Sequence, residues 1–185
     1  TNNEICFVAA KDYTEDEKVN IAPKTTLIIG KNNSGKTTVI EGLKKLVFNS
    51  GFSASDFNFD YLKKLLEMYT VEYLDKADKK VAPTLKFVLT VVIDNNEKDL
   101  LTNIIPFMSV GDVKDTEVQI IIQWAPKNEE LFFKSIKQFV MNGDAYKSQR
   151  FDRFLNLIDE NEFCFYYYNS NMEKRENFSL KKVSS

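Results

Sequence analysis

The residues best suited to chemistry lie between Gly30 and Thr37, where the sequence reads GKNNSGKT. This is the pattern G-x-x-x-x-G-K-T, whose glycines let successive backbone N–H groups converge on a phosphate. Lys36 would reach the β- and γ-phosphate oxygens, and the Thr37 hydroxyl would coordinate Mg²⁺. The pattern predicts a phosphate-binding loop for a magnesium-bound nucleotide. The residues expected to bind it are Gly30, Lys31, Asn32, Asn33, Ser34, Gly35, Lys36, Thr37 and Thr38.

Such a loop must join a strand to a helix, and the flanking sequence predicts both. Residues 25–30 (TTLIIG) form a continuous apolar run with β-branched residues, which is typical of a buried strand. After Lys36 the apolar side chains recur at helical spacing, and Asn-Ser-Gly at 49–51 ends the pattern. The apolar positions of this predicted helix are Val39, Ile40, Leu43, Val47 and Phe48. This setting favours a nucleotide site over a chance glycine-rich turn.

The rest of the chain predicts a mixed or antiparallel sheet with helices around it, an α/β fold in one domain over residues 1–185. Helices are expected around 61–69, around 100–105 where Pro106 would stop the helix, after Pro126 with Asn128 as N-cap, and around 151–158. The runs 84–94 and 117–124 alternate apolar and polar residues, as antiparallel strands with one wet face do. The aromatic run 162–168 reads as a last strand, packed in the core rather than serving as a base-stacking platform.

Composition excludes several classes of function. The chain has 25 basic and 27 acidic residues, a net charge of -2, so no global positive field indicates nucleic acid. Its lack of histidine removes Ser/His and Cys/His hydrolysis and most zinc chemistry. No run is long enough to span a membrane and no signal peptide is evident, so we expect a cytoplasmic protein without a membrane partner.

ATP is the expected nucleotide. GTPases read guanine through an N/T-K-x-D tetrapeptide, and the nearest match, DKAD at 75–78, has the wrong first residue. It also lies in the charged stretch LDKADKK, which is typical of a solvated turn.

Hydrolysis would require a second acidic residue beside Mg²⁺, at the end of a buried strand. Asp94 is the local candidate for this catalytic role. The alternation of Lys86 and Thr90 with apolar residues favours an ordinary strand end instead, because a Walker B strand is apolar on both faces. No LSGG-like segment supplies a second phosphate-binding surface.

The string GKNNSGKTTVIEGL at 30–43 resembles the N-terminal segment of ABC-type ATPases of the OLD (overcoming lysogenization defect) family. These are relatives of the SMC and RecF heads, and some serve as anti-phage nucleases. The order that follows is similar too: GFSASDF, two alternating strands, and an aromatic strand ending in YYYN. The resemblance implies a P-loop NTPase fold, with this chain as the N-terminal lobe of an ABC/AAA-type ATPase head and a piece of a longer protein.

By the same resemblance, the signature motif, the Walker B carboxylates and a Toprim nuclease module would follow downstream. Two heads would sandwich ATP as a homodimer and couple its hydrolysis to a DNA-acting module. Asn169, Ser170 and Asn171 occupy the place of a glutamine-bearing loop, and Lys11 and Tyr13 the place of residues that flank adenine.

Two alternatives stay open. The chain could be an ATP-dependent switch or assembly module with little hydrolysis, or a self-contained P-loop kinase or GTPase that uses Asp94. In the first reading, as for a lone ATPase lobe, these 185 residues would bind Mg-ATP with little turnover.

Overall fold

The structure is a computed structural model that describes residues 36–76, 78–92, 104–108, 117–142 and 149–175. The chain divides into two compact units, Thr1–Leu43 and Lys44–Ser185. The single-domain prediction stays a prediction, because two compact units of one chain can belong to one domain. The predicted strand at 25–30 lies outside the described residues.

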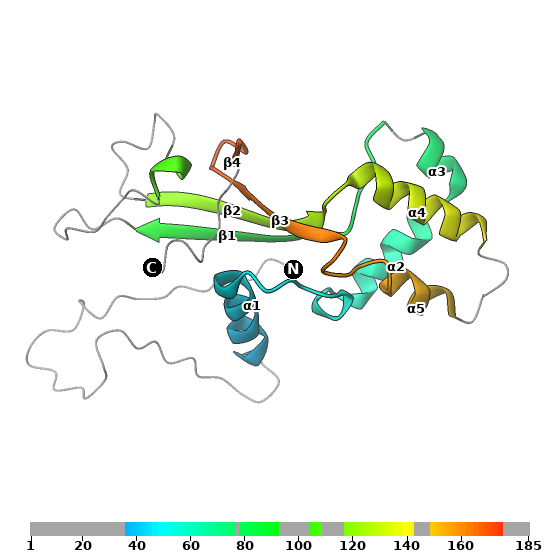
Figure 1. The fold of residues 1–185 in the computed structure, drawn as a ribbon, viewed down its shortest axis with the longest axis horizontal. Coiled ribbons are helices and arrows are strands. Elements are labelled where there is room, and N and C mark those ends of the chain that lie inside the picture. Colours follow the sequence, from blue (N-terminus) through cyan, green and yellow to red (C-terminus); the bar gives the residue numbers. More distant parts are fainter. Residues whose placement is uncertain (1–35, 77, 93–103, 109–116, 143–148, 176–185) are drawn as a thin grey trace, which may run out of the picture. The chain divides into compact units, whose positions relative to one another are not determined.

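Four strands form the described sheet of the second unit, in the order β1-β2-β3-β4. They are β1 (Leu85–Val92), β2 (Glu117–Pro126), β3 (Phe163–Tyr168) and β4 (Lys174–Arg175). Every neighbouring pair is antiparallel, as the alternating sequence predicts, with Phe87 opposite Ile122 and Ile122 opposite Tyr167. Figure 1 shows the three longer strands side by side.

The two faces of this sheet differ as predicted. In β1, Lys86 and Thr90 are exposed while Phe87 and Leu89 turn to the other face and are half-buried. Phe52 covers that apolar face, with its ring stacked on Phe87 at 5.3 Å between centroids. Aromatic contacts of this kind are stronger than their buried area alone implies. The core is therefore aromatic on one side of the sheet.

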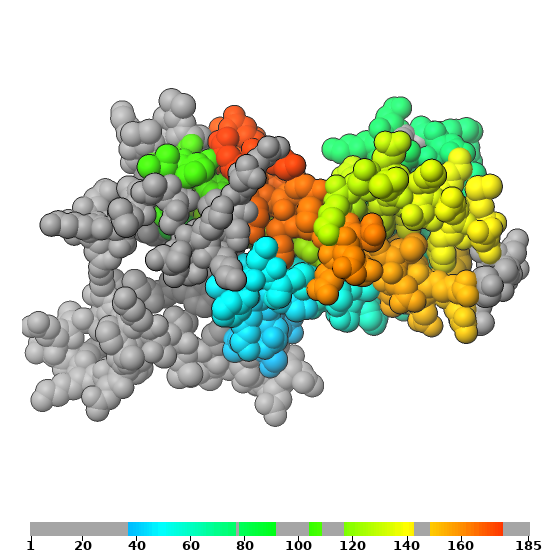
Figure 2. Space-filling model, viewed as in Figure 1, coloured from blue at the N-terminus to red at the C-terminus, as the bar shows by residue number. Residues whose placement is uncertain are grey.

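The helices of the second unit gather around one buried tyrosine. They are α2 (Phe59–Met68), α3 (Val71–Lys76), α4 (Glu129–Met141) and α5 (Arg150–Leu155). Tyr69 follows α2 and is fully buried. The centroid of its ring lies 6.3 Å from that of Phe133 in α4 and 6.0 Å from that of Phe154 in α5. Its hydroxyl donates to the Val81 carbonyl at 2.6 Å, which holds the segment leading to β1. Figure 2 shows α3 and α4 in contact on the viewed face.

Local sequence explains most of these helices. Asn58 and Asn128 cap α2 and α4, each accepting backbone N–H groups on its side-chain oxygen. Both helices lie where the apolar period predicts them, and α5 begins at Arg150, one residue before the predicted range 151–158, and ends at Leu155 within it. Of the described residues, none lies in a helix with the length and apolar character needed to cross a bilayer.

Two sequence predictions were wrong in detail, and a third lies largely outside the described residues. In the stretch LDKADKK, residues 74–76 end helix α3 rather than lying in a solvated turn, and the Thr70 hydroxyl accepts from the Tyr73 N–H in the first turn of that helix. Most of the helix expected around 100–105 lies outside the described residues, and Pro106 itself sits in the first turn of the 3-10 helix η4 (Ile105–Phe107), where its missing N–H costs nothing. In the helix after the phosphate loop, Val47 and Phe48 are exposed and Leu46 is buried instead.

Candidate nucleotide-binding site

The motif lysine is the first residue that the structure describes, and it is helical. Helix α1 spans Lys36–Phe48, and its first residue is the motif lysine. Thr37 and Thr38, the next two residues, are exposed. The remaining predicted ligands, Gly30, Lys31, Asn32, Asn33, Ser34 and Gly35, lie outside the described residues. A helix start carries free N–H groups and the positive end of the helix dipole, which together favour a phosphate.

The other predicted site residues are not tested by the structure. Asp94, Lys11 and Tyr13 all lie outside the described residues. The strand that precedes Asp94 is β1, which stands at the end of the described strand order and has a polar face.

The C-terminal end of α1 is closed by a Schellman motif. The Ser50 N–H donates to the Lys45 carbonyl at 3.1 Å and the Asn49 N–H to the Leu46 carbonyl at 3.4 Å. Asn49 adopts the left-handed conformation that this motif requires, with φ 54°. Its side-chain oxygen accepts a hydrogen bond from the Tyr167 hydroxyl of β3 at 3.3 Å. The helix end is thereby joined to the sheet of the second unit.

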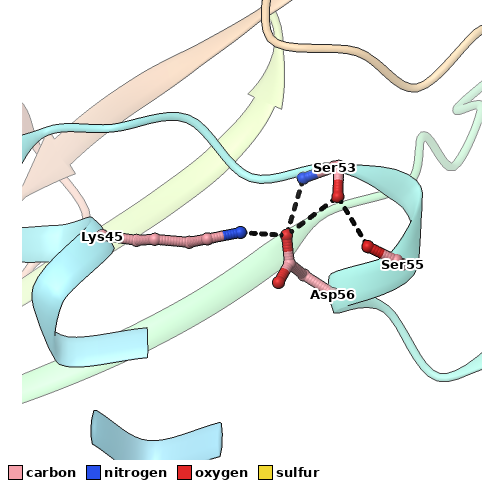
Figure 3. Close-up of polar contacts among 4 residues, drawn as sticks. All are labelled: Lys45, Ser53, Ser55 and Asp56. Atoms are coloured by element: carbon pink, nitrogen blue, oxygen red, sulfur yellow. Dashed lines mark hydrogen bonds and ion pairs between the residues drawn. The ribbon is translucent and has the colours of Figure 1, made fainter. Parts of the chain in front are cut away.

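A second contact holds the same helix end. Lys45 donates from Nζ to Oδ2 of Asp56 at 2.6 Å (Figure 3). The same Nζ lies 5.3 Å from the centroid of the Phe52 ring. Asp56 lies in the 3-10 helix η2 (Ala54–Asp56). The same Oδ2 accepts from the backbone N–H of Ser53 at 2.8 Å and from its hydroxyl at 3.1 Å. The carboxylate is therefore oriented by its own turn as well as by the lysine.

The electrostatics of Asp56 follow from these contacts. Partial burial alone would raise the pKa of its carboxyl group. The hydrogen bonds from Lys45 and Ser53, with the positive charge of Lys45, outweigh burial and lower the pKa below 3.8. Asp56 is thus ionised at neutral pH and paired with a cation.

The sequence alone does not predict the ion pair between Lys45 and Asp56. A signal was present, because Ser53 and Asp56 have the three-residue spacing of a capping box, which the structure contains. Nothing in the local sequence links that turn to a lysine of the preceding helix, since the link depends on how the chain folds back.

Asn169, at the place of the glutamine-bearing loop, is engaged within a hairpin. It is 1% exposed and its side chain donates to Glu173 Oε2 and accepts from the Glu173 N–H, both at 2.8 Å. Arg175 of β4 also binds Glu173 Oε2, at 2.8 Å. These bonds close the connection between β3 and β4, so the Asn169 amide is used structurally. Ser170 and Asn171 are exposed at the turn.

The aromatic strand β3 divides its side chains between two faces. Phe163 and Tyr167 are buried in the core, as predicted, whereas Tyr166 and Tyr168 are half-buried on the opposite face. The Tyr166 hydroxyl donates to the carbonyls of Pro126 and Lys127 at 3.0 and 3.1 Å. The Lys174 ammonium lies 4.7 Å from the Tyr166 ring centroid, so part of that ring is already covered. Burial raises the pKa of both half-buried tyrosines.

Among the residues that the structure describes, no cluster of three or more Asp, Glu, Cys or His side chains could hold a metal ion. Thr37, the residue predicted to coordinate Mg²⁺ through its hydroxyl, is among the described residues. Mg²⁺ in phosphate-loop sites is held by one or two protein oxygens together with phosphate oxygens and waters. A single exposed threonine at the helix start fits that donor set.

Comparison with known proteins gives one relative of clear similarity. The chain is 44% identical, over 191 aligned positions, to Endonuclease GajA of Bacillus cereus (strain HuB5-5). The alignment covers 98% of this chain and 28% of that protein, so the chain spans little more than a quarter of the relative's length. No family model matches the chain, and no solved structure matches it. At this identity the chain and the matching part of the endonuclease are homologues.

Proposed function

We propose that this chain binds Mg-ATP through residues 30–38, as the N-terminal lobe of an ABC-type ATPase head with a P-loop fold. The observation that carries the proposal is that the residues from Lys36, the lysine of the G-x-x-x-x-G-K-T pattern, to Phe48 are helical. A helix that follows such a loop directs its first N–H groups at the anion that the lysine would contact.

Each group would have a distinct role. Successive backbone N–H groups of the loop would hold the β-phosphate, and the Lys36 ammonium would neutralise charge on the β- and γ-oxygens. The Thr37 hydroxyl would hold Mg²⁺, which supplies charge neutralisation on the phosphates when bound. The carboxylates that orient the attacking water would come from elsewhere in a longer protein, as the resemblance to OLD-family heads implies.

The proposed biological role is an ATPase coupled to cleavage of DNA. Two observations support it. The string at 30–43 resembles the ATPase heads of a family that includes nucleases. The chain is also homologous, along almost its whole length, to part of a protein named as an endonuclease. We propose that ATP occupancy of paired heads controls a DNA-cutting module in the longer protein.

Calorimetric titration with a non-hydrolysable ATP analogue and Mg²⁺ tests the binding proposal. Lys36→Ala should weaken binding about 10- to 100-fold, the size of one or two lost charge-assisted hydrogen bonds. The matched control is Lys64→Ala, which removes an exposed lysine of α2 and should leave affinity unchanged.

Circular dichroism establishes that both variants fold. Equal affinity of folded Lys36→Ala and the unaltered protein would exclude the phosphate-loop assignment.

A further inference from the structure

The sheet has a second face that lies outside the hydrophobic core. Successive side chains of a strand point to opposite faces, so the register assigns each residue to one face. Phe87, Ile122 and Tyr167 share the core face, and the residues beside them in each strand share the other. Ile121 marks the difference, because it is buried at 6% exposure and yet stands apart from the core cluster that contains Ile120 and Ile122. The core therefore does not explain the composition of this second face.

Two neighbouring rows of side chains cross the second face at right angles to the strands. From β1 to β4, the first row consists of Val88, Ile121, Tyr168 and Lys174. The second row, from β1 to β3, consists of Lys86, Gln123 and Tyr166. Both lysines are exposed, Val88 is 50% exposed, and both tyrosines are half-buried. We call the residues of these two rows the tyrosine face.

The tyrosine face carries positive charge at both edges of the sheet. Lys86 lies on β1 and Lys174 on β4, the first and last of the described strands in the sheet order. Within the described part of the chain, neither lysine forms an ion pair, and no residue of the face is acidic. Lys174 is directed onto the face, because its ammonium lies 4.7 Å from the centroid of the Tyr166 ring. Two exposed cations on opposite edges suit a polymer with repeating negative charge.

Carboxylates lie beyond both ends of the tyrosine face in the direction of the strands. Glu117 is the first residue of β2, and Glu129 begins α4 soon after β2 ends. Burial is the main cause of the raised pKa of both tyrosines, and the charge of Glu129 adds to it, so this carboxylate lies near their hydroxyl groups. A polyanion is repelled at both ends and attracted between them. Its path would therefore cross the strands from Lys86 to Lys174 rather than follow them.

Tyr168 supplies the surface that distinguishes an unpaired base from a paired one. Within the described residues its ring stacks on no other ring, whereas the Tyr166 ring already has the Lys174 ammonium beside it. Stacking on such a ring tolerates any base, because every base has a π-face. Gln123, in the next row, offers both a donor and an acceptor to the edge of a base. In a duplex the bases are already stacked and paired, so these two side chains favour a single strand.

We propose that the tyrosine face binds single-stranded DNA, with one base stacked on Tyr168 and phosphates contacted by Lys86 and Lys174. The two lysines stand on strands that are three spacings apart, roughly 14 Å. Exposed aromatic residues on a four-stranded sheet stack two or three bases in other nucleic-acid-binding folds. The choice of DNA as the polymer rests on the proposed function, whereas the surface and its charges do not depend on nucleotide binding at residues 30–38.

The test titrates a fluorescent oligothymidine of about 20 nucleotides with the full-length protein that carries this chain and follows anisotropy. Divalent cations are left out, because enzymes that cut phosphodiesters commonly require them. The double variant Lys86→Gln, Lys174→Gln should bind about tenfold more weakly at about 0.15 M salt, with a salt dependence of log K that is less steep by about 1.4, because two phosphate contacts are lost. The matched control, Lys64→Gln with Lys134→Gln, removes the same charge from exposed positions of α2 and α4. Its affinity should stay within about twofold and its salt dependence should not change.

Variants of Tyr168 test the stacking itself. Tyr168→Leu should weaken binding of the single strand about fivefold or more, whereas Tyr168→Phe keeps the ring and should bind within about twofold of the unaltered protein. Binding of a duplex of the same length should be equal in all three proteins, since its bases are not available to the ring. An oligonucleotide that carries 5-iodouracil locates the contact directly, because irradiation should join it to a peptide that contains Tyr168.

Circular dichroism establishes that every variant folds. Unaltered affinity and salt dependence of the folded Lys86→Gln, Lys174→Gln protein would overturn the inference, and so would photo-crosslinks confined to other parts of the protein. If Tyr168→Leu weakened duplex binding as much as binding of the single strand, stacking of an unpaired base would be excluded. Calorimetric titration of the same sample with an ATP analogue tests the proposed nucleotide binding separately. If the nucleotide binds but the unaltered protein does not bind the oligonucleotide, only this inference fails.

Discussion

Gly51 stands where the chain leaving α1 passes close to a distant segment. A Cβ atom built on Gly51 would lie 2.7 Å from the Cβ of Glu160, which is closer than non-bonded Cβ atoms approach in proteins. Gly42, inside α1, has no such neighbour: a Cβ there would meet nothing within 4 Å. The same substitution therefore has opposite consequences at two glycines of one short stretch.

Gly51→Ala should lower the free energy of unfolding by about 1–3 kcal/mol, because the backbone near Glu160 must shift. Gly42→Ala should raise it by up to about 1 kcal/mol, since alanine is the better helix former and the site is open. Chemical denaturation of both variants measures the difference. A shift in the same direction for both would contradict this account.

The residue scale is also where sequence reasoning is weakest. The pattern at 30–37 identifies candidate phosphate ligands because backbone geometry and one lysine are encoded within eight positions. The contact of Lys45 with Asp56 and with the ring of Phe52 is not encoded locally, because the fold brings these residues together. Asn169 shows the same limit, since its side chain is consumed by Glu173 in a hairpin.

At the scale of elements, the end of α1 shows how a helix is stopped and attached at once. Asn49 adopts φ 54° and accepts a hydrogen bond from Tyr167. Asparagine enters the left-handed region more readily than other residues with a Cβ, and it also supplies an acceptor. One side chain thus serves both the cap and the contact with β3.

Asn49→Ala and Asn49→Gly separate these two contributions. Both variants lose the contact with the Tyr167 hydroxyl, but only alanine resists the left-handed conformation. We expect Asn49→Ala to be less stable than Asn49→Gly by about 1 kcal/mol. Urea unfolding monitored by helical circular dichroism measures both. If the two variants were equally stable, the conformational requirement at Asn49 would be refuted.

Most elements could be predicted from the sequence because their patterns are local. Asn128 followed by apolar residues at helical spacing locates α4, and the alternation of polar with apolar residues locates β1 and β2 and indicates antiparallel strands. The inward face of α1 could not be predicted, because apolar residues surround that helix and periodicity alone does not choose among them. Helix α3 was missed because its six residues are too few for a period to be seen.

At the scale of the whole molecule, the proposed binding of ATP and its hydrolysis would belong to different lengths of chain. The chain spans 28% of the endonuclease that it matches. By the resemblance to OLD-family heads, the groups that cleave the phosphate lie beyond these residues and on an opposing head. A lobe that only binds should retain affinity but lose turnover.

We therefore expect the 185-residue chain to bind a non-hydrolysable ATP analogue yet release phosphate from ATP about 100-fold or more slowly than the full-length protein. Phosphate release at saturating ATP measures both, with Lys36→Ala in the full-length protein defining the background. Equal turnover by the short chain would instead favour a self-contained enzyme that uses Asp94.

The strand order has a consequence for biosynthesis. Each described strand pairs with the one before it in the chain, from β1 through β4. No strand has to wait for a later one to be inserted between it and its neighbour. The described strands can therefore pair one after another as the ribosome delivers them, and a newly made strand finds its partner already in place.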